Sequence, residues 1–426
     1  MMKRRLIALL LCTAPVVAEA GESWVLMTDL WGNRTYQTLT LSGQGEQMTG
    51  DLDGNALKGR RIGNAITFST TDANSRSAFT GKIAGDTMTG NADMPDTNNR
   101  SARAQHSFTA RRIPDRPAGA PKRHDFKPID YSNSFDPHRA PVLTIWPGDS
   151  VHTTTIDSGG VDEKGITRAL YGNPQTGPFF VAGASPGDTL VIKIKRLTLN
   201  RDYADSLDDI VRRARSTTLA VKSTELGRPV RWKLDRVRGI ATSDGLKGLT
   251  VPVRPMLGGL AVAPGNGSPP ISTGDTGSFG GNMDFNEVVE GNIVYLPVQQ
   301  PGALLYLGDA HALQGDGETS QYALETSMDV EFSVDLVKGL SIPTPRVESP
   351  TQIMVLGQAG SLDDALRSAT SGMVEWLAKD YGLSVSDSAQ VLGSAVKYSI
   401  ANLAGRSVGV AAKIDKSVLV GFKTGS

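Results

Sequence analysis

The chain of 426 residues has almost no cysteine: Cys12 is the only one, and it lies close to the N-terminus. Disulfides and thiol nucleophiles both need cysteine. If the N-terminal segment is removed, as we predict below, the mature chain has neither of them.

An excess of charge of either sign is also missing, because Lys and Arg together number 44 and Asp and Glu together number 44. Binding to nucleic acid or to an anionic membrane would call for a basic stripe. Beyond the N-terminus, no apolar run approaches the roughly 20 residues that are needed to cross a bilayer. We therefore predict no nucleic-acid partner and no membrane span.

The N-terminus has the pattern of a secretory leader. Lys3 and Arg5 belong to a basic start, residues 6–17 are largely apolar, and Ala18 and Ala20 are the small residues of a cleavage site. We predict a signal peptide over residues 1–20 that is cut after Ala20, and hence a periplasmic or secreted protein.

Two domains are expected after this leader, because the chain is too long for one ordinary core. Short alternating strands broken by Gly, Asn and Asp occupy residues 21–112 and predict a small antiparallel β-barrel or meander. Within it, the segment 45–54 is echoed by 85–94, as in successive hairpins of one meander. Residues 113–134 contain four prolines and predict a linker, which leaves 135–426 as the second domain.

The second domain combines turn-rich strands with late helices. Ser361 and Ser386 are predicted N-caps, each followed by an apolar stripe at helical spacing, and the second stripe continues to Leu403. Residues 204–215 predict a further short helix, and strands should follow over 407–422. The predicted fold class is therefore β-rich α+β: a small antiparallel β-barrel domain, then a mixed β-sheet or barrel-like domain with two late helices.

The densest chemical segment is 303–325, where an apolar strand breaks into a glycine loop that carries Asp309, His311, Asp316 and Glu318. An Asp-x-His step places two side chains on one face of an extended segment, and glycines let the following acids fold back toward them. Oxygen and nitrogen ligands could converge there.

Four glycine-containing segments occur in the second domain, over residues 173–188, 255–264, 280–284 and 308–318. Their content and their order make the chain from about residue 135 to the C-terminus resemble the acetamidase/formamidase family of amide hydrolases. The resemblance implies hydrolysis of carbon–nitrogen bonds, other than peptide bonds, in small linear amides. It also implies a divalent metal ion and self-association into a homo-oligomer. The leader and the extra N-terminal β domain look foreign to compact members, so the identity of the amide stays open.

Metal-assisted hydrolysis is the mechanism that we favour, because the mature chain has no thiol and its nearest glycine- and serine-rich stretch, residues 274–281, lacks the paired serines and the lysine of Ser-Ser-Lys amidases. A divalent ion can acidify water and polarise an amide carbonyl. No HExxH motif is present, so the ligands must come from separate loops. With the resemblance as support, we assign Asp157, Asp309 and His311 as ligands, with zinc as the expected ion and calcium as the alternative.

Glu318 is the candidate general base, and Asp316 and Glu325 are alternatives for that role. The residues that we expect to bind the small-molecule amide substrate are Asn282, Asp284 and Gln314. Asp284 is also a candidate for the metal shell. The alternative function is a noncatalytic periplasmic receptor for an amide or a sugar, built on the same pocket.

Overall fold

The computed structural model describes residues 21–72, 75–99, 101–222, 226–265 and 267–422. The predicted leader, including Cys12, lies outside these residues. The chain divides into two compact units. The N-terminal unit holds the residues up to Arg34 and Thr38–Ile113, and the C-terminal unit holds Thr35–Gln37 and the chain from Pro114 onward.

The N-terminal unit is a closed antiparallel barrel in which each strand pairs with the next and the last pairs with the first. Its strands are β1 (Glu22–Leu30), β2 (Asn33–Gln44), β3 (Gln47–Leu52), β4 (Asn55–Ile62), β5 (Ala65–Asp72), β6 (Ser75–Ala84), β7 (Thr87–Pro95) and β8 (Arg103–Arg112). Alternate residues point inward, and Trp24, Phe68, Phe79 and Phe108 fill the interior. Gly81 is required beside this aromatic core, because a Cβ there would lie 2.9 Å from the Phe108 ring. The barrel confirms the predicted fold of this part of the chain.

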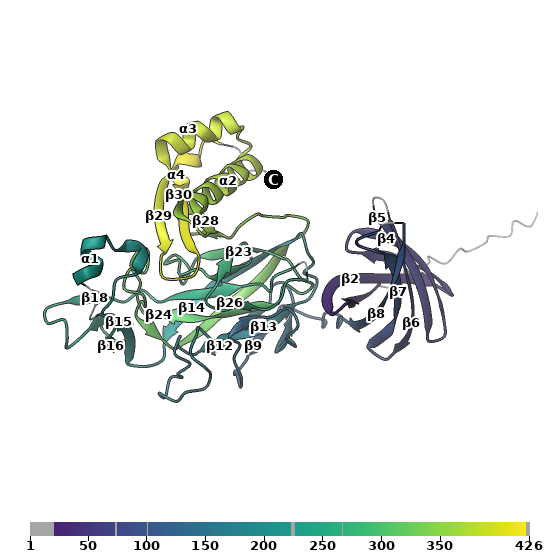
Figure 1. The fold of residues 1–426 in the computed structure, drawn as a ribbon, viewed down its shortest axis with the longest axis horizontal. Helices are drawn as coiled ribbons and strands as arrows, with labels where there is room; N and C mark the ends of the chain where they lie inside the picture. The colour runs from purple at the N-terminus through teal and green to yellow at the C-terminus, as the bar shows by residue number, and fades with distance from the viewer. Residues whose placement is uncertain (1–20, 73–74, 100, 223–225, 266, 423–426) are drawn as a thin grey trace, which may run out of the picture. The chain divides into compact units, whose positions relative to one another are not determined.

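The C-terminal unit is built on two large sheets (Figure 1). The first sheet follows the order β18-β17-β16-β15-β25-β24-β19-β22-β21, with β11 and β13 attached. Its strands are β11 (Leu143–Ile145), β13 (Gln175–Val181), β15 (Tyr203–Leu207), β16 (Pro229–Asp235), β17 (Ile240–Thr242), β18 (Thr250–Pro252), β19 (Met256–Ala261), β21 (Thr276–Gly277), β22 (Gly280–Asn282), β24 (Leu305–His311) and β25 (Glu325–Thr326).

The second sheet follows the order β29-β30-β28-β27-β23-β14-β26-β12-β9. Its strands are β9 (Arg123–Asp125), β12 (Ser150–Thr155), β14 (Thr189–Leu199), β23 (Ile293–Pro297), β26 (Met328–Val337), β27 (Arg346–Glu348), β28 (Gln352–Ala359), β29 (Lys397–Asn402) and β30 (Val408–Asp415). A separate pair joins β10 (Ser134–Phe135) to β20 (Ile271–Ser272). The two sheets pack through apolar side chains, as where Phe179 of β13 meets Phe332 of β26 with ring centroids 5.5 Å apart.

Strand β9 lies in the segment that the sequence analysis assigned to a linker, and the buried carboxylate of Asp149 holds it in place. This carboxylate accepts the backbone N–H of Lys122 at 2.8 Å and that of Trp146 at 3.2 Å. It also lies 2.9 Å from His124 Nε2 on β9. Burial raises the pKa of Asp149, but these donors outweigh burial and lower the pKa below its usual value.

The two predicted late helices are confirmed as α2 (Leu362–Tyr381) and α3 (Val385–Ala395), and α2 lies along β28 and β30 (Figure 1). Ser361 caps α2 as predicted, by accepting the N–H of Asp364. The predicted cap Ser386 was wrong, because Ser384 forms a capping box with Asp387. The helix prediction through Leu403 was also wrong, since α3 ends at Ala395 and the chain continues as strand β29.

Other elements are short: 3₁₀ helix η1 (Arg212–Ala214), α1 (Thr217–Lys222) and α4 (Lys416–Leu419). The helix predicted over 204–215 was wrong. Its first residues lie in β15, where pairing with both β16 and β25 supplies the backbone hydrogen bonds. Within the described residues, no helix is both long enough and apolar enough to cross a membrane.

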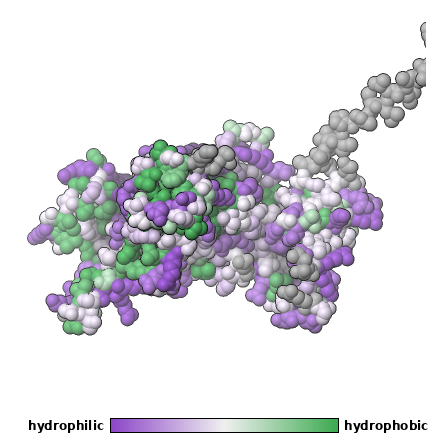
Figure 2. Space-filling view, turned by 90° about the horizontal axis from the view of Figure 1, so that it is seen from above, coloured by the Kyte–Doolittle hydropathy of each residue, from purple (hydrophilic) through white to green (hydrophobic). Residues whose placement is uncertain are grey.

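Seen from above, hydrophobic residues gather on part of the surface (Figure 2). The exposed apolar side chains of the C-terminal helical region include Leu366, Val385 and Val420.

Candidate active site

Five titratable side chains of the C-terminal unit form a buried acid–histidine cluster. Asp284, Asp309 and His311 can bring ligand atoms within 4.8 Å of one another, and so can His311, Glu318 and Glu325. All five are buried, with His311 and Asp284 at 0% exposure. The cluster joins four carboxylates to one imidazole.

Strand pairing brings much of the cluster together. Every residue of β24 is buried, and its last residue, His311, pairs with Glu325 of β25 on one side and Met256 of β19 on the other. Asp309 lies two residues earlier on β24, so the predicted convergence of the Asp-x-His step is met: Asp309 Oδ1 lies 3.6 Å from His311 Nε2.

Three of the carboxylates stand on strained backbone. Asp284, Asp309 and Glu318 have φ angles of 41°, 52° and 47°, in the left-handed region that residues with a Cβ seldom adopt. Such strain costs on the order of 1–3 kcal/mol per residue and concentrates at functional sites. The surrounding sheets hold these acids in place against that cost.

Gly258 of β19 forms the floor under two of the acids. A Cβ at this position would lie 2.5 Å from Asp284 Oδ1 and 2.7 Å from Asp309 Oδ2. The glycine in segment 255–264 therefore has a steric reason: it lets the carboxylates lie against the backbone of β19.

Gln314 sets the orientation of the His311 ring. The Gln314 Nε2 group donates to the Asp284 carbonyl at 2.5 Å, which turns Gln314 Oε1 toward His311 Nδ1 at 2.9 Å. The Nδ1 atom therefore carries a proton and donates it. Nε2 is left facing the acids, 3.2 Å from Glu325 Oε1.

Four buried atoms of this cluster have no hydrogen-bond partner among the described residues: Asp284 Oδ1, Asp309 Oδ1, His311 Nε2 and Glu325 Oε2. The 3.2 Å approach of His311 Nε2 to Glu325 is close enough for an ion pair but lacks hydrogen-bond geometry. An unsatisfied buried polar group costs about 1–3 kcal/mol, and more when it is charged. A divalent cation held by Asp284, Asp309 and His311 could satisfy unpaired atoms of these three residues, and imidazole with carboxylates is a donor set that such ions accept. The residues thus fit a metal ion.

The pKa shifts of the cluster residues also indicate that the buried acids need a positively charged partner or protons. Burial raises the pKa of Asp284 and of Glu318 well above the usual range, and neighbouring acids raise both further. Burial also raises the pKa of Glu325, to about 7. Burial lowers the pKa of His311, but the charges of Glu325 and Asp309 outweigh burial and raise it. Buried acids at this density need either protons or a cation as partners.

Three asparagines hold the other side of the acids. Asp284 Oδ2 accepts from Asn282 Nδ2 and from Asn402 Nδ2, each at 2.6 Å. Asn173 Nδ2 donates to Asn282 Oδ1 at 2.9 Å and to Asp309 Oδ2 at 3.2 Å. The sequence analysis missed Asn173 and Asn402. Asn173 begins the loop 173–188 and could have been found there, whereas no local pattern marks Asn402.

The structure does not bring Asp157 and Asp316 into the cluster. Asp157 forms a buried ion pair with Arg201 at 2.7 Å and also accepts the N–H of Val161. A carboxylate neutralised in this way has a partner already. Asp316 is exposed and accepts from Asn286 Nδ2 at 2.8 Å, because the glycine loop turns it outward. The remaining candidates, Glu318 and Glu325, lie within the cluster.

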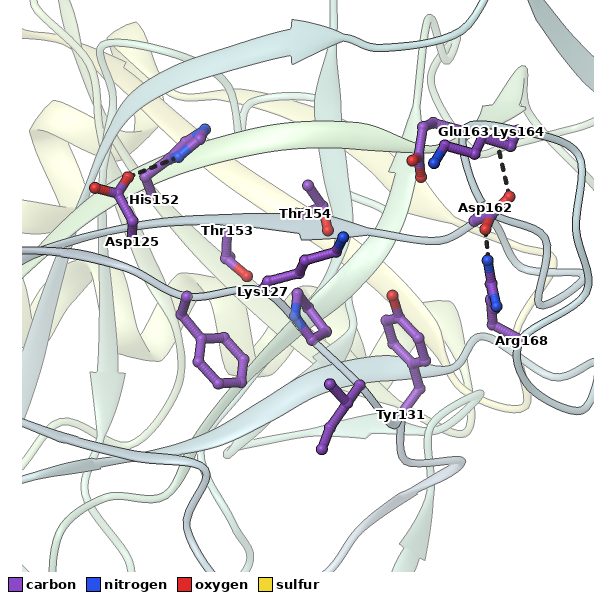
Figure 3. Close-up of a pocket in the computed structure, with 13 residues that line it drawn as sticks. Asp125, Lys127, Tyr131, His152, Thr153, Thr154, Asp162, Glu163, Lys164 and Arg168 are labelled. Atoms are coloured by element: carbon purple, nitrogen blue, oxygen red, sulfur yellow. Dashed lines mark hydrogen bonds and ion pairs between the residues drawn. The ribbon is translucent and has the colours of Figure 1, made fainter.

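The cavity in Figure 3 lies elsewhere in the C-terminal unit. It has a volume of about 530 Å³ and is lined by the segment 125–131, the strand residues 152–154 and the loop 162–168. Asp162 pairs with Arg168 at 2.7 Å there, and His152 lies 3.1 Å from Asp125. No residue of the acid–histidine cluster lines it, so this cavity is not where the acids converge.

Comparison with known proteins agrees with the geometry. A model of the acetamidase/formamidase family matches residues 271–402, which include all five cluster residues. The structure of an acetamidase from Yersinia enterocolitica aligns with a TM-score of 0.62 and 29% identity, over 70% of this chain and 94% of that chain. A predicted acetamidase/formamidase from Thermoanaerobacter tengcongensis aligns with a TM-score of 0.61 and 28% identity, over 71% of this chain and 98% of that chain.

Among curated proteins, an acetamidase of Mycolicibacterium smegmatis is 41% identical over 61 residues. That stretch is 14% of this chain and only 15% of the length of the curated relative. The family model covers about a third of the chain, and the aligned structures, two acetamidase or acetamidase/formamidase folds, cover about 70% of it, so the C-terminal unit is similar to the acetamidase/formamidase family and is preceded by an additional N-terminal β domain.

Proposed function

We propose that the protein hydrolyses the carbon–nitrogen bond of small linear amides. The observation that carries the proposal is the convergence of four carboxylates and one imidazole, with four unsatisfied atoms, in a buried centre. The match of residues 271–402 to the acetamidase/formamidase family and the similarity to a solved acetamidase support this activity.

Asp284, Asp309 and His311 would hold a divalent ion, and Glu318 and Glu325 form a second possible ligand group with the same His311. We expect zinc, with calcium as the alternative, because the set includes an imidazole and no thiolate. The ion would supply Lewis acidity that stabilises negative charge on the amide carbonyl oxygen. This set replaces Asp157 of the sequence-based assignment by Asp284.

Glu318 is the proposed general base. Its Oε1 atom accepts the N–H of Ala323 at 3.0 Å, which fixes the carboxylate at the edge of the cluster. In this position Glu318 can take a proton from the attacking water and return it to the nitrogen that leaves. Burial raises the pKa of Glu318, which suits the second step because it favours the protonated carboxyl that donates to the leaving nitrogen.

Asn282 and Asp284, which the sequence analysis expected to contact the amide, have other partners: Asn282 donates to Asp284 and accepts from Asn173, and Asp284 also accepts from Asn402. We therefore propose Asn282 as a support for Asp284, and Asp284 as a metal ligand. Gln314 is engaged in a similar way. Both ends of its amide are engaged, with His311 and with the Asp284 carbonyl, so we propose it as a positioning residue for the imidazole.

The test is release of ammonia from a panel of short amides by protein with measured metal content, before and after chelation. We expect turnover that chelation removes and that the added ion restores. Absence of turnover on every amide, with the ion bound in full, would refute the proposal. Binding without turnover would favour the noncatalytic receptor instead.

Two further features remain proposals of the same kind. Residues 1–20 support export to the periplasm or beyond, which cell fractionation tests. The resemblance supports a homo-oligomer, which light scattering of the purified protein tests.

A further inference from the structure

The acid–histidine cluster is closed off from solvent. Exposure is 0% for His311, 2% for Asp309, 4% for Glu325 and 6% for Glu318. None of these residues lines the cavity of Figure 3, the hollow beside His152 and Arg196, or the hollow beside Leu41 and Arg61. An amide can therefore reach the cluster only if part of its cover moves.

One part of the cover is the segment 158–172. The carbonyl of Ser158 accepts the N–H groups of Gly172 and Asn173, which closes the segment into a loop. Asn173 then donates to Asp309 of the cluster. Asn133, which lies outside the loop, donates from its Nδ2 atom to the carbonyls of residues 170–172. These hydrogen bonds fix the end of the loop.

The other part of the cover is the segment 313–324. It contains Glu318 of the cluster, and Ala323 near its end donates to that carboxylate. Gln321 has a φ of 70°, which turns the backbone sharply just before Tyr322. Ser320 Oγ donates to the carbonyl of Tyr322 at 2.7 Å and stabilises this turn.

The two segments meet through tyrosine side chains. The hydroxyls of Tyr171 and Tyr322 contact each other, and their ring centroids are 6.3 Å apart. Tyr171 is 63% exposed, so the contact lies at the surface. Burial of part of the ring, followed by the charges of Glu325 and Asp309, raises the pKa of Tyr171. The chain that follows Tyr171 leads directly to Asn173, which donates to Asp309 of the cluster.

We propose that Tyr171 and Tyr322 form a gate over the acid–histidine cluster and restrict the size of the acyl group that enters. The closure itself follows from burial and from the hydroxyl contact. The identity of the entering molecule, a small amide, rests on the proposed function. One hydroxyl contact at the surface can break without loss of the sheets beneath, and a smaller side chain in place of a tyrosine ring would widen the opening.

The first experiment measures opening without any turnover. Hydrogen exchange of the segments 157–173 and 318–326 is compared in the full-length protein and in Tyr171→Phe and Tyr322→Phe. Loss of one net hydrogen bond predicts exchange that is about 2- to 12-fold faster in both segments. The matched control is Tyr398→Phe, which removes another exposed tyrosine hydroxyl, 2.8 Å from Thr370 Oγ1 and outside the cluster. It should leave both segments unchanged.

The second experiment measures selection. Values of kcat/KM for formamide, acetamide, propionamide and benzamide are compared in the wild type, Tyr322→Phe and Tyr322→Ala. We expect Tyr322→Ala to raise the ratio for benzamide over formamide by about tenfold, a typical effect of one side chain on pocket discrimination. Circular dichroism verifies that Tyr322→Ala is folded, and Tyr322→Phe gives the same direction with a smaller change.

The outcomes separate the two proposals. Unchanged exchange in both Phe variants would overturn the gate. Faster exchange with an unchanged benzamide to formamide ratio would overturn its role in selecting the acyl group. Faster exchange in a protein that hydrolyses no amide would leave the gate in place and refute the proposed function.

Discussion

Replacing Gly258 by alanine should disturb the acid–histidine cluster from below. The added Cβ would lie 2.5 Å from Asp284 Oδ1 and 2.7 Å from Asp309 Oδ2, and also 3.0 Å from the Asp309 carbonyl oxygen. Real Cβ atoms essentially never show contacts under 3.0 Å, so the carboxylates must shift. Neither acid can move freely, because Asn402 and Asn282 hold Asp284 and Asn173 holds Asp309.

The expected cost follows from this crowding. Overpacking a buried position costs about 1–3 kcal/mol of stability. Displaced ligand oxygens should also weaken metal affinity or activity by about 10- to 100-fold, as changes in the support of metal ligands do. The assays are thermal unfolding, zinc affinity by chelator competition, and kcat on the best amide. The control is Gly393→Ala in α3, where an added Cβ meets nothing within 4 Å and where helix propensity predicts a gain of up to about 1 kcal/mol. Zinc affinity and kcat within twofold of the wild type in Gly258→Ala would show that the floor of the site is not where we place it.

Three further predictions concern other parts of the C-terminal unit. Glu318→Gln should lower kcat by about 10²- to 10⁴-fold while zinc content stays full, because it removes the proton acceptor and keeps the shape; a loss below threefold in steady-state ammonia release would rule Glu318 out. Asp157→Asn should cost about 3–5 kcal/mol in urea unfolding, because it leaves the buried Arg201 without its counter-charge, and should still bind zinc; a stable variant that has lost its zinc would restore Asp157 as a ligand. Asp149 has a lowered pKa in the folded state, so the stability it contributes is present above its unfolded pKa of about 3.9 and is lost as pH falls through the folded value. The stability gap between wild type and Asp149→Asn should accordingly be constant from pH 7 to 5 and close below about pH 4, and a gap that persists at pH 2 would contradict this assignment.

The fold was predictable wherever a local period decides the structure. Alternating residues in the barrel and the Ser361-capped stripe of α2 each specify their element from nearby residues alone. Prediction failed where tertiary pairing competes with local pattern. Residues 204–207 belong to a segment with helical spacing, yet they form strand β15 between β16 and β25. Hydrogen bonds to both neighbouring strands outweigh the local preference for a helix.

The cluster residues that lie close together in the sequence were predictable, and those that lie far apart in the sequence were much less so. Asp309 and His311 share one strand, so their approach follows from a period of two, and Glu318 follows in the same glycine loop. Asp284 meets them only because β19 lies next to both β22 and β24. Asn402 meets them because β29 ends beside Gly317. No spacing in the sequence indicates that Asp284 or Asn402 lies close to Asp309 and His311.

Asp157 illustrates the reverse error, and it shows what decides whether a conspicuous acid is a ligand. From the sequence it was an acid at the end of a strand, as good a candidate as Asp309. The difference lies in the partner: Arg201, with its side chain only 1% exposed, neutralises Asp157, whereas Asp309 shares the single imidazole of His311 with other acids and its Oδ1 atom has no hydrogen-bond partner among the described residues. A buried acid whose charge is already compensated stabilises the fold, and a buried acid that is not compensated requires something else. The strained backbone at Asp284, Asp309 and Glu318 argues in the same direction, because a fold that only needed stability would gain by relaxing it.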